Sequence, residues 1–223
     1  WTLLVGYVAY YLCRVNLSAS SELVMRELGI DREAFGLVSA ASTWAYAVGK
    51  FSHGFLADRY GGRAMFLLGI FGAAVFSGAC GVFGSLGALV TLWSLNRFAQ
   101  AGGWVGTVQV AAQWYRRDEV GTAMSMISLS YLVGDVAGRG LAATLVAQGG
   151  GLSTVFLVPA SITLVLALVS VFTLKASPSR IGEPELNVAE AGEARDERGF
   201  GWADLRALLS SRGFGVLCIL SVL

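Results

Sequence analysis

Long apolar stretches, separated by short polar segments, set the pattern of this sequence. Within residues 64–115 the only charged side chain is that of Arg97, and within 120–174 the only two are those of Asp135 and Arg139. A helix needs about 20 apolar residues to cross the hydrocarbon core of a bilayer. Stretches of this length lack the alternation, over about ten residues at a time, that is typical of membrane β-barrel strands. The pattern therefore predicts an all-α membrane protein.

Six stretches are long enough to be transmembrane helices, and we expect them at residues 1–20, 35–57, 64–83, 88–115, 121–147 and 152–174. Residues 1–174 would then form a six-helix transmembrane bundle. Residues 175–212 predict a flexible cytoplasmic loop that ends in a short interfacial helix near Trp202. Residues 213–223 predict the truncated start of a seventh transmembrane helix, so we expect the chain to be a piece of a longer protein.

Composition excludes several other classes of protein. Charged residues make up 14% of the chain and hydrophobic residues 55%, whereas a soluble domain carries about 25% charged residues. The net charge of +1 gives no basis for binding a nucleic-acid backbone, so we expect no nucleic-acid partner. The three cysteines lie in apolar stretches, and His53 is the single histidine. We therefore expect neither a metal centre nor a cofactor, and no enzymatic activity.

Lysine and arginine are unevenly distributed among the segments that connect the predicted spans. The segments after the second, fourth and sixth spans hold ten of these residues, whereas those after the first, third and fifth hold two, Arg26 and Arg32. Connecting segments rich in Lys and Arg lie on the cytoplasmic side of a membrane. We therefore expect the N-terminal side of the chain and the loop at 175–212 to be cytoplasmic.

Two segments of similar sequence suggest an internal repeat. The segment 46–50 (Tyr-Ala-Val-Gly-Lys) is followed 85 residues later by 131–135 (Tyr-Leu-Val-Gly-Asp), and Arg14 is followed 83 residues later by Arg97. Each repeat would contain three spans, and an odd number of spans inverts the second copy relative to the first. Two inverted three-helix repeats are typical of secondary transporters.

Five charged side chains lie inside the predicted spans. One is the acid Asp135, and four are cations, namely Arg14, Lys50, Arg97 and Arg139. Placing an Arg or Lys at the centre of a membrane helix costs about 2.5–3.5 kcal/mol on insertion scales. A cost of this size is unusual without a function. The surplus of positive charge predicts that the interior of the bundle attracts an anion.

Tyr7, Tyr11 and Arg14 have the i, i+4, i+7 spacing that places them on one face of the first helix. A guanidinium binds phosphate or carboxylate through two parallel hydrogen bonds, and the phenol hydroxyls are further donors. We therefore expect this face to bind the anion. The alternative is that Arg14 extends to the lipid headgroups, which would leave only a helical membrane protein of unknown purpose.

Polar residues of two other spans are further candidates for the site. Lys50, deep in the second span, is either a second anion ligand or the partner of Asp135. In the fourth span, Arg97 and Gln100 share one helical face, and they either contact the substrate or hold helices together by hydrogen bonds. Trp104 follows a run at 101–103 (Ala-Gly-Gly) that we expect to be flexible, and it lines the cavity or faces lipid.

Asp135 and Arg139 are spaced i, i+4 in the fifth span, with the acid before the base. This spacing allows a self-neutralising pair. The alternative is a coupling or gating element in which Asp135 exchanges its partner, or takes up a proton, during a transport cycle. Tyr131 lies one turn before Asp135 and is a candidate for the same element.

The segment after the second span, residues 54–63, has the sequence Gly-Phe-Leu-Ala-Asp-Arg-Tyr-Gly-Gly-Arg. It resembles the signature loop of the major facilitator superfamily, and the residues that match are Gly54, Asp58, Arg59, Gly61 and Arg63. It departs from the signature at Gly62, where a basic residue is usual. The resemblance implies a 12-helix fold made of two six-helix halves, of which this chain is the N-terminal half. It also implies that the loop latches the two halves in one state of the transport cycle.

Within that superfamily, residues 6–16 (Gly-Tyr-Val-Ala-Tyr-Tyr-Leu-Cys-Arg-Val-Asn) resemble the organophosphate:anion antiporters, the group of glycerol-3-phosphate and hexose-phosphate transporters. The resemblance implies that Arg14 grips the phosphate, and the other matching residues are Tyr7, Tyr11, Tyr46, Lys50, Gln100 and Trp104. Tyr131 stands where glycerol-3-phosphate carriers have a substrate-linked histidine, which leaves the substrate open.

The resemblance implies a secondary transporter of the bacterial inner membrane that works by alternating access. Its expected substrate is a small organic anion, most of all a phosphorylated metabolite, exchanged for inorganic phosphate. One alternative is a carboxylate:proton symporter of the same fold, with a proton as the coupling ion. Another is a membrane sensor that binds a sugar phosphate and signals to a partner. In each case the expected neighbours are the lipid bilayer and the C-terminal half of the same protein.

Overall fold

Seven α-helices make up most of the part of the chain that the structure describes, namely residues 1–182, Arg206 and Ser210. In this computed structural model they are α1 (Thr2–Ala19), α2 (Ser21–Leu28), α3 (Arg32–Tyr60), α4 (Gly62–Cys80), α5 (Leu86–Trp114), α6 (Arg117–Ala147) and α7 (Leu152–Thr173). A 3-10 helix, η1, follows at Pro178–Ile181. The prediction that the chain is helical is confirmed for these residues. The predicted interfacial helix and seventh span lie outside the described residues, apart from Arg206 and Ser210.

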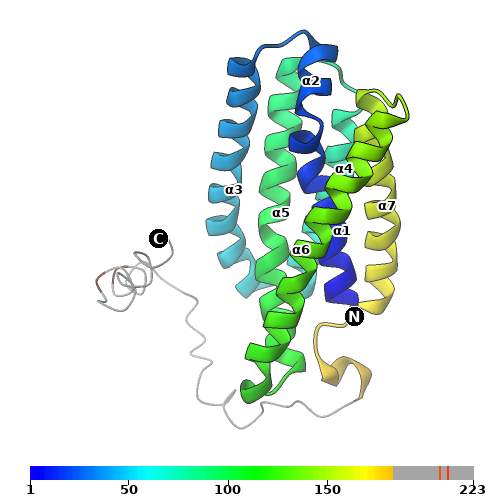
Figure 1. Cartoon of the computed structure of the whole chain (residues 1–223). Helices are drawn as coiled ribbons and strands as arrows, with labels where there is room; N and C mark the ends of the chain where they lie inside the picture. Colours follow the sequence, from blue (N-terminus) through cyan, green and yellow to red (C-terminus); the bar gives the residue numbers. More distant parts are fainter. Residues whose placement is uncertain (183–205, 207–209, 211–223) are drawn as a thin grey trace. The chain divides into compact units, whose positions relative to one another are not determined.

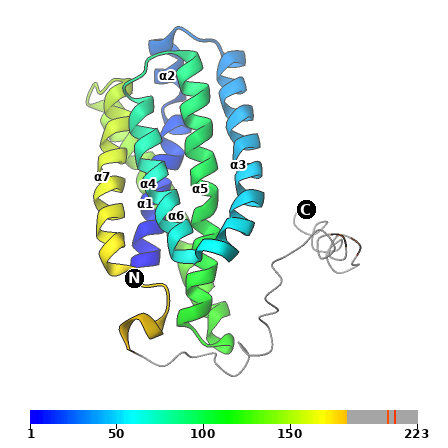
Figure 2. The same ribbon diagram turned by 180° about the vertical axis from the view of Figure 1, so that it is seen from behind.

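The six long helices run up and down and overlap the six predicted spans (Figures 1 and 2). The short helix α2 was not predicted, because it falls in what was expected to be a loop. Gly29 ends α2 in the left-handed conformation, with φ of 62°, where a side chain would be strained. The Asp31 carboxylate then accepts a hydrogen bond from Ala34 N at 2.8 Å and starts α3.

The signature segment is mostly helical, which corrects the expectation that residues 58–63, between the second and third predicted spans, form a loop. Helix α3 continues through Asp58 and Arg59 to Tyr60, and α4 begins at Gly62. Only Gly61 separates the two helices, with φ of 80°, a conformation that glycine adopts without strain. A single glycine is therefore enough to reverse the chain between the second and third long helices.

Three helices of the described residues are long and apolar enough to cross a membrane by composition alone, namely α4, α6 and α7. The other three long helices do not meet this criterion. Helix α1 contains Arg14 and Asn16, α3 contains Lys50 and His53, and α5 contains Arg97 and other polar groups. The cations Arg14, Lys50 and Arg97 thus lie on helices outside this set, whereas Asp135 and Arg139 lie on α6.

Packing between the long helices follows a repeated pattern. Helix α3 packs on α5 as α6 packs on α1, and α4 packs on α5 as α7 packs on α1, while α4 also packs on α7. Glycines occupy equivalent contacts: a Cβ on Gly49 would lie 2.8 Å from Phe98 O of α5, and one on Gly134 would lie 2.7 Å from Tyr11 Cβ of α1. These glycines let the helices approach closely, as in small-residue packing of membrane helices.

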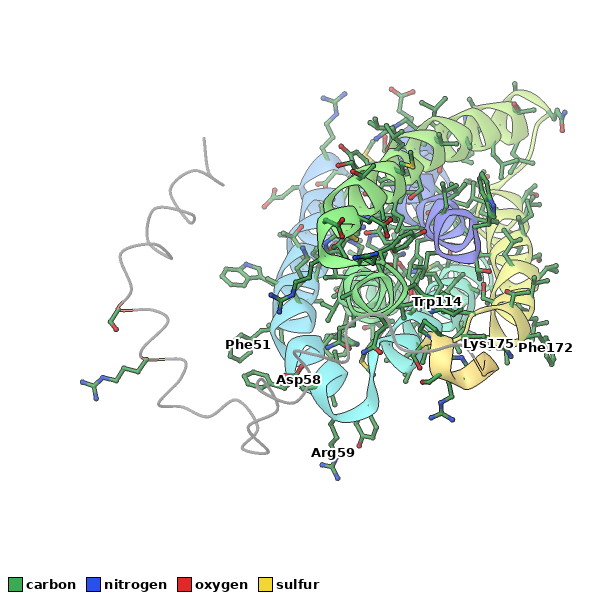
Figure 3. The ribbon with its side chains drawn as sticks, turned by 90° about the horizontal axis from the view of Figure 1, so that it is seen from below. Phe51, Asp58, Arg59, Trp114, Phe172 and Lys175 are labelled. Carbon is green, nitrogen blue, oxygen red and sulfur yellow. The ribbon has the colours of Figure 1, made fainter. Side chains whose placement is uncertain are left out.

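One end of the bundle holds the start of α1, the α3–α4 and α5–α6 turns and the end of α7, at the bottom of Figure 1. Seen from that end, Arg59 projects away from the bundle, while Trp114 and Lys175 lie together (Figure 3). Trp114 Nε1 donates a hydrogen bond to Lys175 O at 3.0 Å. Among residues 1–182, the basic residues that follow the second, fourth and sixth predicted spans therefore lie at one end, whereas Arg26 and Arg32 belong to the other.

Candidate functional site

Three cations from three helices lie around the ring of Tyr46. The guanidinium carbons of Arg14 on α1 and Arg97 on α5 each lie 4.8 Å from its centroid. Lys50 Nζ, one turn along α3 from Tyr46, lies 5.3 Å from the same centroid. Arg14 also lies 5.1 Å from the ring of Tyr11. An interaction of this kind is worth about 0.5–2 kcal/mol, most when the cation is desolvated.

Arg14 therefore faces the interior of the described bundle and not the lipid headgroups. It is half-buried, like Tyr46 and Arg97, whereas Lys50 is exposed. Among the described residues, no ion pair includes Arg14, Lys50 or Arg97. The aromatic ring offsets part of the cost of these cations but does not neutralise them, so the group keeps a net positive charge.

Aromatic rings extend the site along α1. The ring of Tyr7 lies 5.3 Å from that of Trp104 in an edge-on contact and 5.9 Å from that of Tyr11. Tyr11 in turn lies 6.2 Å from the exposed Tyr131 of α6. Tyr7 is buried, and Trp104 packs against the same core. The structure thus brings together Arg14, Tyr7, Tyr11, Trp104 and Tyr131.

Gln100 is placed differently from the other candidates. It is buried, and its Nε2 donates to Cys13 O at 3.3 Å and to Asn96 Oδ1 at 2.6 Å. An amide nitrogen has two donors, so in this conformation Gln100 has none left for an anion. Its Oε1 has no hydrogen-bond partner among the described residues. The geometry agrees with the helix-linking alternative for Gln100.

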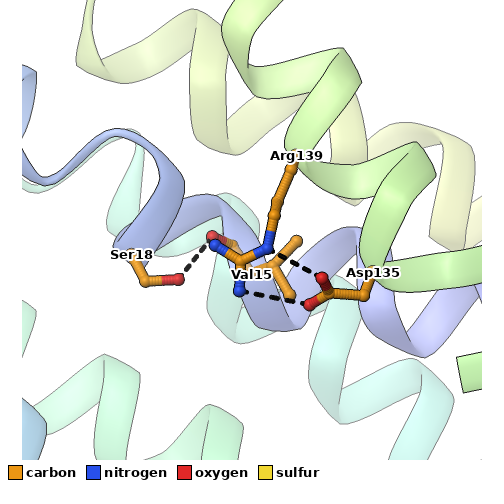
Figure 4. A network of polar contacts seen from close by, with 4 residues as sticks. All are labelled: Val15, Ser18, Asp135 and Arg139. Atoms are coloured by element: carbon orange, nitrogen blue, oxygen red, sulfur yellow. Dashed lines mark hydrogen bonds and ion pairs between the residues drawn. The ribbon is translucent and has the colours of Figure 1, made fainter. Parts of the chain in front are cut away.

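Asp135 and Arg139 form a two-pronged ion pair on α6 (Figure 4). Arg139 Nε donates to Asp135 Oδ2 at 2.8 Å and Nη2 donates to Oδ1 at 3.2 Å. The side chain of Arg139 is 54% exposed and that of Asp135 is 35% exposed. Asp135 is therefore paired with Arg139 and not with Lys50, and the two charges cancel.

The run at 101–103, expected to be flexible, is helical and closely packed. A Cβ on Gly102 would lie 2.6 Å from His53 Cδ2, and one on Gly103 would lie 2.6 Å from Tyr10 Cζ. These glycines are required because rings of α3 and α1 fill the space beside them. His53 is fully buried, with Nδ1 2.7 Å from Gly49 O.

The residues of the signature segment hold helices together at the lower end of Figure 1. Asp58 Oδ1 accepts a hydrogen bond from Gln109 Nε2 of α5 at 3.4 Å. Arg63 donates to Leu174 O and to Val171 O, both at 2.7 Å, and so binds the carbonyls at the end of α7. Cations at a helix C-terminus also interact favourably with its dipole. The signature arginine thereby joins the start of α4 to the end of α7.

Comparison with known proteins gives the family. The sequence pattern of the Major Facilitator Superfamily matches residues 3–223. This chain belongs to the Major Facilitator Superfamily. It is therefore an integral membrane protein, as the apolar stretches predicted.

Several curated relatives of this superfamily member are named as transporters. A probable hexose phosphate transport protein of Chlamydia pneumoniae is 23% identical over 190 residues, covering 83% of this chain and 41% of that protein. A glycerol-3-phosphate transporter of Bacillus subtilis is 28% identical over 190 residues, covering 82% and 42%. A probable galactarate/D-glucarate transporter of Bacillus subtilis is 29% identical over 220 residues, covering 91% and 48%. The chain spans less than half the length of these relatives.

Two of these relatives are named for phosphorylated metabolites, which confirms the predicted resemblance, and the third is named for sugar carboxylates. All three are named as transport proteins and not as enzymes. The superfamily assignment also confirms the identification that was based on residues 54–63.

The structure adds Tyr46 to the candidate site and has Arg97 beside it. In the sequence, Tyr46 takes part only in the repeat and the resemblance, whereas Arg97 takes part in the repeat and is a candidate for substrate contact or for linking helices. Two signals pointed to them in the sequence: Tyr46 lies one turn before Lys50, and Arg97 is the only charge in the stretch 64–115. What the sequence does not contain is the contact between α1, α3 and α5 that brings them together.

Proposed function

We propose that this chain is the N-terminal half of a secondary transporter that carries a small organic anion. The substrate class that we favour is a phosphorylated metabolite. The observation that supports this proposal is the convergence of Arg14, Arg97 and Lys50 on Tyr46 without a carboxylate partner among the described residues. Positive charge held in a membrane protein without a counter-charge is costly, and an anionic substrate offsets that cost when it binds.

In the proposed binding step, Arg14 engages two oxygens of the anion through its guanidinium fork. Arg97 and Lys50 reduce the remaining charge, and the hydroxyls of Tyr7 and Tyr11 are the neutral donors beside Arg14. Trp104, which contacts Tyr7, forms the apolar wall against which the organic part of the substrate packs. Each cation interacts more strongly with the anion here than in water, because the surroundings are less polar.

We infer that all six long helices cross the membrane and that residues 1–174 form one half of a 12-helix transporter. The repeated packing of α3 on α5 and α6 on α1 supports two inverted three-helix repeats. Residues 175–212 then connect the halves on the cytoplasmic side, and 213–223 begin the second half. The halves rock around a site near the midplane of the bilayer to give alternating access, with the signature segment as the latch.

Exchange for inorganic phosphate is the coupling mode that we propose, because phosphate has the same charged group as the substrate. The cations around Tyr46 would bind either anion, so phosphate can occupy the site while the transporter changes back to its first conformation. Uptake should then require phosphate inside the vesicle and should not follow a proton gradient.

A second candidate substrate is a sugar-derived carboxylate. The similarity to a protein named as a galactarate/D-glucarate transporter favours it, and a guanidinium binds carboxylate as well as phosphate. In that case Asp135 is the candidate group for taking up a coupling proton. Uptake that follows a proton gradient and ignores internal phosphate would select this alternative.

The test is uptake of radiolabelled glycerol-3-phosphate, hexose phosphate and glucarate by the complete protein in proteoliposomes, with and without internal phosphate. We expect phosphate-dependent uptake of a phosphate ester, and we expect Arg14→Ala to lower it about 100-fold or more, in line with the loss of a buried charge-assisted contact. The matched control is Arg32→Ala. Arg32 is exposed and is the first residue of α3, several turns before Tyr46 and Lys50. Undiminished uptake of all three anions by Arg14→Ala would contradict the proposal.

A further inference from the structure

A buried set of hydrogen bonds connects the helices that hold Arg14 and Arg97. Gln100 Nε2 of α5 donates to Cys13 O of α1 at 3.3 Å and to Asn96 Oδ1 at 2.6 Å. Asn96 Nδ2 in turn donates to Ala73 O of α4 at 2.9 Å. The side chains of Gln100 and Asn96 are both buried, so these bonds do not compete with water.

The two acceptors of the Gln100 amide are direct neighbours of the two arginines in the sequence. Cys13 precedes Arg14, and Asn96 precedes Arg97. Gln100 itself lies one helical turn after Arg97. One amide group therefore connects the main chain beside one guanidinium to the side chain beside the other.

We propose that Gln100 is a positioning residue that fixes the separation of Arg14 and Arg97, so that both guanidinium groups meet one tetrahedral anion. This proposal rests on the proposed function. It explains why Gln100, which matches a residue of the related antiporters, has both amide donors occupied by Cys13 O and Asn96 Oδ1. It also assigns Gln100 no contact with the substrate.

The physical need for such a residue comes from the charges. The guanidinium groups of Arg14 on α1 and Arg97 on α5 repel each other, and neither forms an ion pair with a carboxylate among the described residues. The ring of Tyr46 attracts both, but it sits on α3 and does not join α1 to α5. The Gln100 amide supplies that direct connection.

The decisive variant is Gln100→Leu, which keeps the size of the side chain and removes both donors. The matched control is Thr163→Val. Thr163 of α7 is also buried, and its Oγ1 donates to Ala9 O of α1 at 3.0 Å and accepts from Cys13 Sγ at 3.2 Å. The control therefore removes two buried hydrogen bonds to the same helix, one of them at Cys13, and leaves the hydrogen bond from Gln100 Nε2 to Cys13 O in place.

The first measurement is binding of inorganic phosphate and of glucarate to the purified complete protein. We expect Gln100→Leu to raise the Kd for phosphate about tenfold, as for a buried hydrogen-bonding group left unpaired, and to raise the Kd for planar carboxylates less. The ratio of the two constants should change. A general loss of structure would lower both affinities together, and Thr163→Val should leave the ratio as it is.

The second measurement does not depend on any anion. Spin labels at Ser18→Cys on α1 and Leu95→Cys on α5, both exposed positions, report the separation of the helices. The protein without these two introduced cysteines gives the background signal. We expect the distance distribution to broaden in Gln100→Leu and to stay unchanged in Thr163→Val. An unchanged distribution would overturn the proposal, and so would a broadened one with an unchanged ratio of affinities.

If the unaltered protein bound none of the tested anions, the proposed function would fail on its own. The distance distribution of Gln100→Leu would then still decide whether Gln100 holds α1 against α5.

Discussion

The cations around Tyr46 and the ion pair on α6 are two different ways of placing charge in a membrane helix. Arg14, Arg97 and Lys50 face an aromatic ring, which attracts them without cancelling their charge. Arg139 instead meets a carboxylate one turn away, at 2.8 Å and 3.2 Å. The first arrangement leaves the capacity to bind an anion, whereas the second is already satisfied.

The comparison teaches that the number of charges in the spans is a poor guide to the site. All five charges have similar costs of insertion, but only those around Tyr46 lack an acid partner among the described residues. The residue that follows each packing glycine contributes to the difference. Gly49 and Gly134 each let a helix approach its neighbour closely, but the residue after Gly49 is Lys50 and the residue after Gly134 is Asp135.

The largest effect is expected from Gly49→Val, which disrupts the packing of α3 on α5 one turn from Tyr46. Its new side chain would meet Phe98 O and Ala101 Cβ at 2.8–2.9 Å and push α3, with Tyr46, away from α5. We expect the free energy of unfolding to fall by about 1–3 kcal/mol, as for overpacking, together with loss of transport. Thermal unfolding and uptake measure both effects.

The control for this variant is Gly36→Val, because Gly36 lies on the same helix with nothing within 4 Å of the added Cβ. Equal stability and equal uptake in the two variants would show that close approach of α3 to α5 does not matter.

A smaller effect is expected from Tyr46→Leu, which removes the ring and keeps the bundle. Losing three cation–π contacts of about 0.5–2 kcal/mol each should raise the Kd for phosphate about tenfold or more, because the cations then spread apart. Tyr46→Phe keeps the ring and should bind within about threefold of the unaltered protein. Equal affinities for the two variants would mean that the ring has no role in arranging the cations.

The smallest effect is expected at the α6 pair. Asp135→Asn alone should lower uptake about two- to fivefold, as expected for an i, i+4 pair of this exposure. The double variant Asp135→Asn/Arg139→Gln removes both charges and should recover most of the loss. A double variant that transports no better than Asp135→Asn would instead support a coupling role for Asp135.

The sequence predicts best what lies on one helix. The spacing of Tyr7, Tyr11 and Arg14 put them on one face, and the structure has Arg14 over Tyr11 and Tyr7 beside Tyr11. The long apolar stretches likewise predicted the positions of six long helices. Both inferences depend only on the geometry of a helix and on local composition.

The sequence predicts less well what depends on contacts between helices. Polar residues at Asp58 and Arg59 suggested a loop, but α3 continues to Tyr60 because Gly61 alone can make the turn. The glycines at 102–103 suggested flexibility, but they admit the rings of His53 and Tyr10. Whether Gln100 has a donor free for an anion is decided by Cys13 O, which is 87 residues away in the chain.

Arg63 and Trp114 have a mechanical consequence for the segment that leaves the bundle. Arg63 binds the carbonyls of Val171 and Leu174, and Trp114 binds that of Lys175. Unwinding the last turn of α7 would therefore also break hydrogen bonds to α4, and moving Lys175 away would break one to α5. The end of α7 is thus anchored by side chains of two other helices.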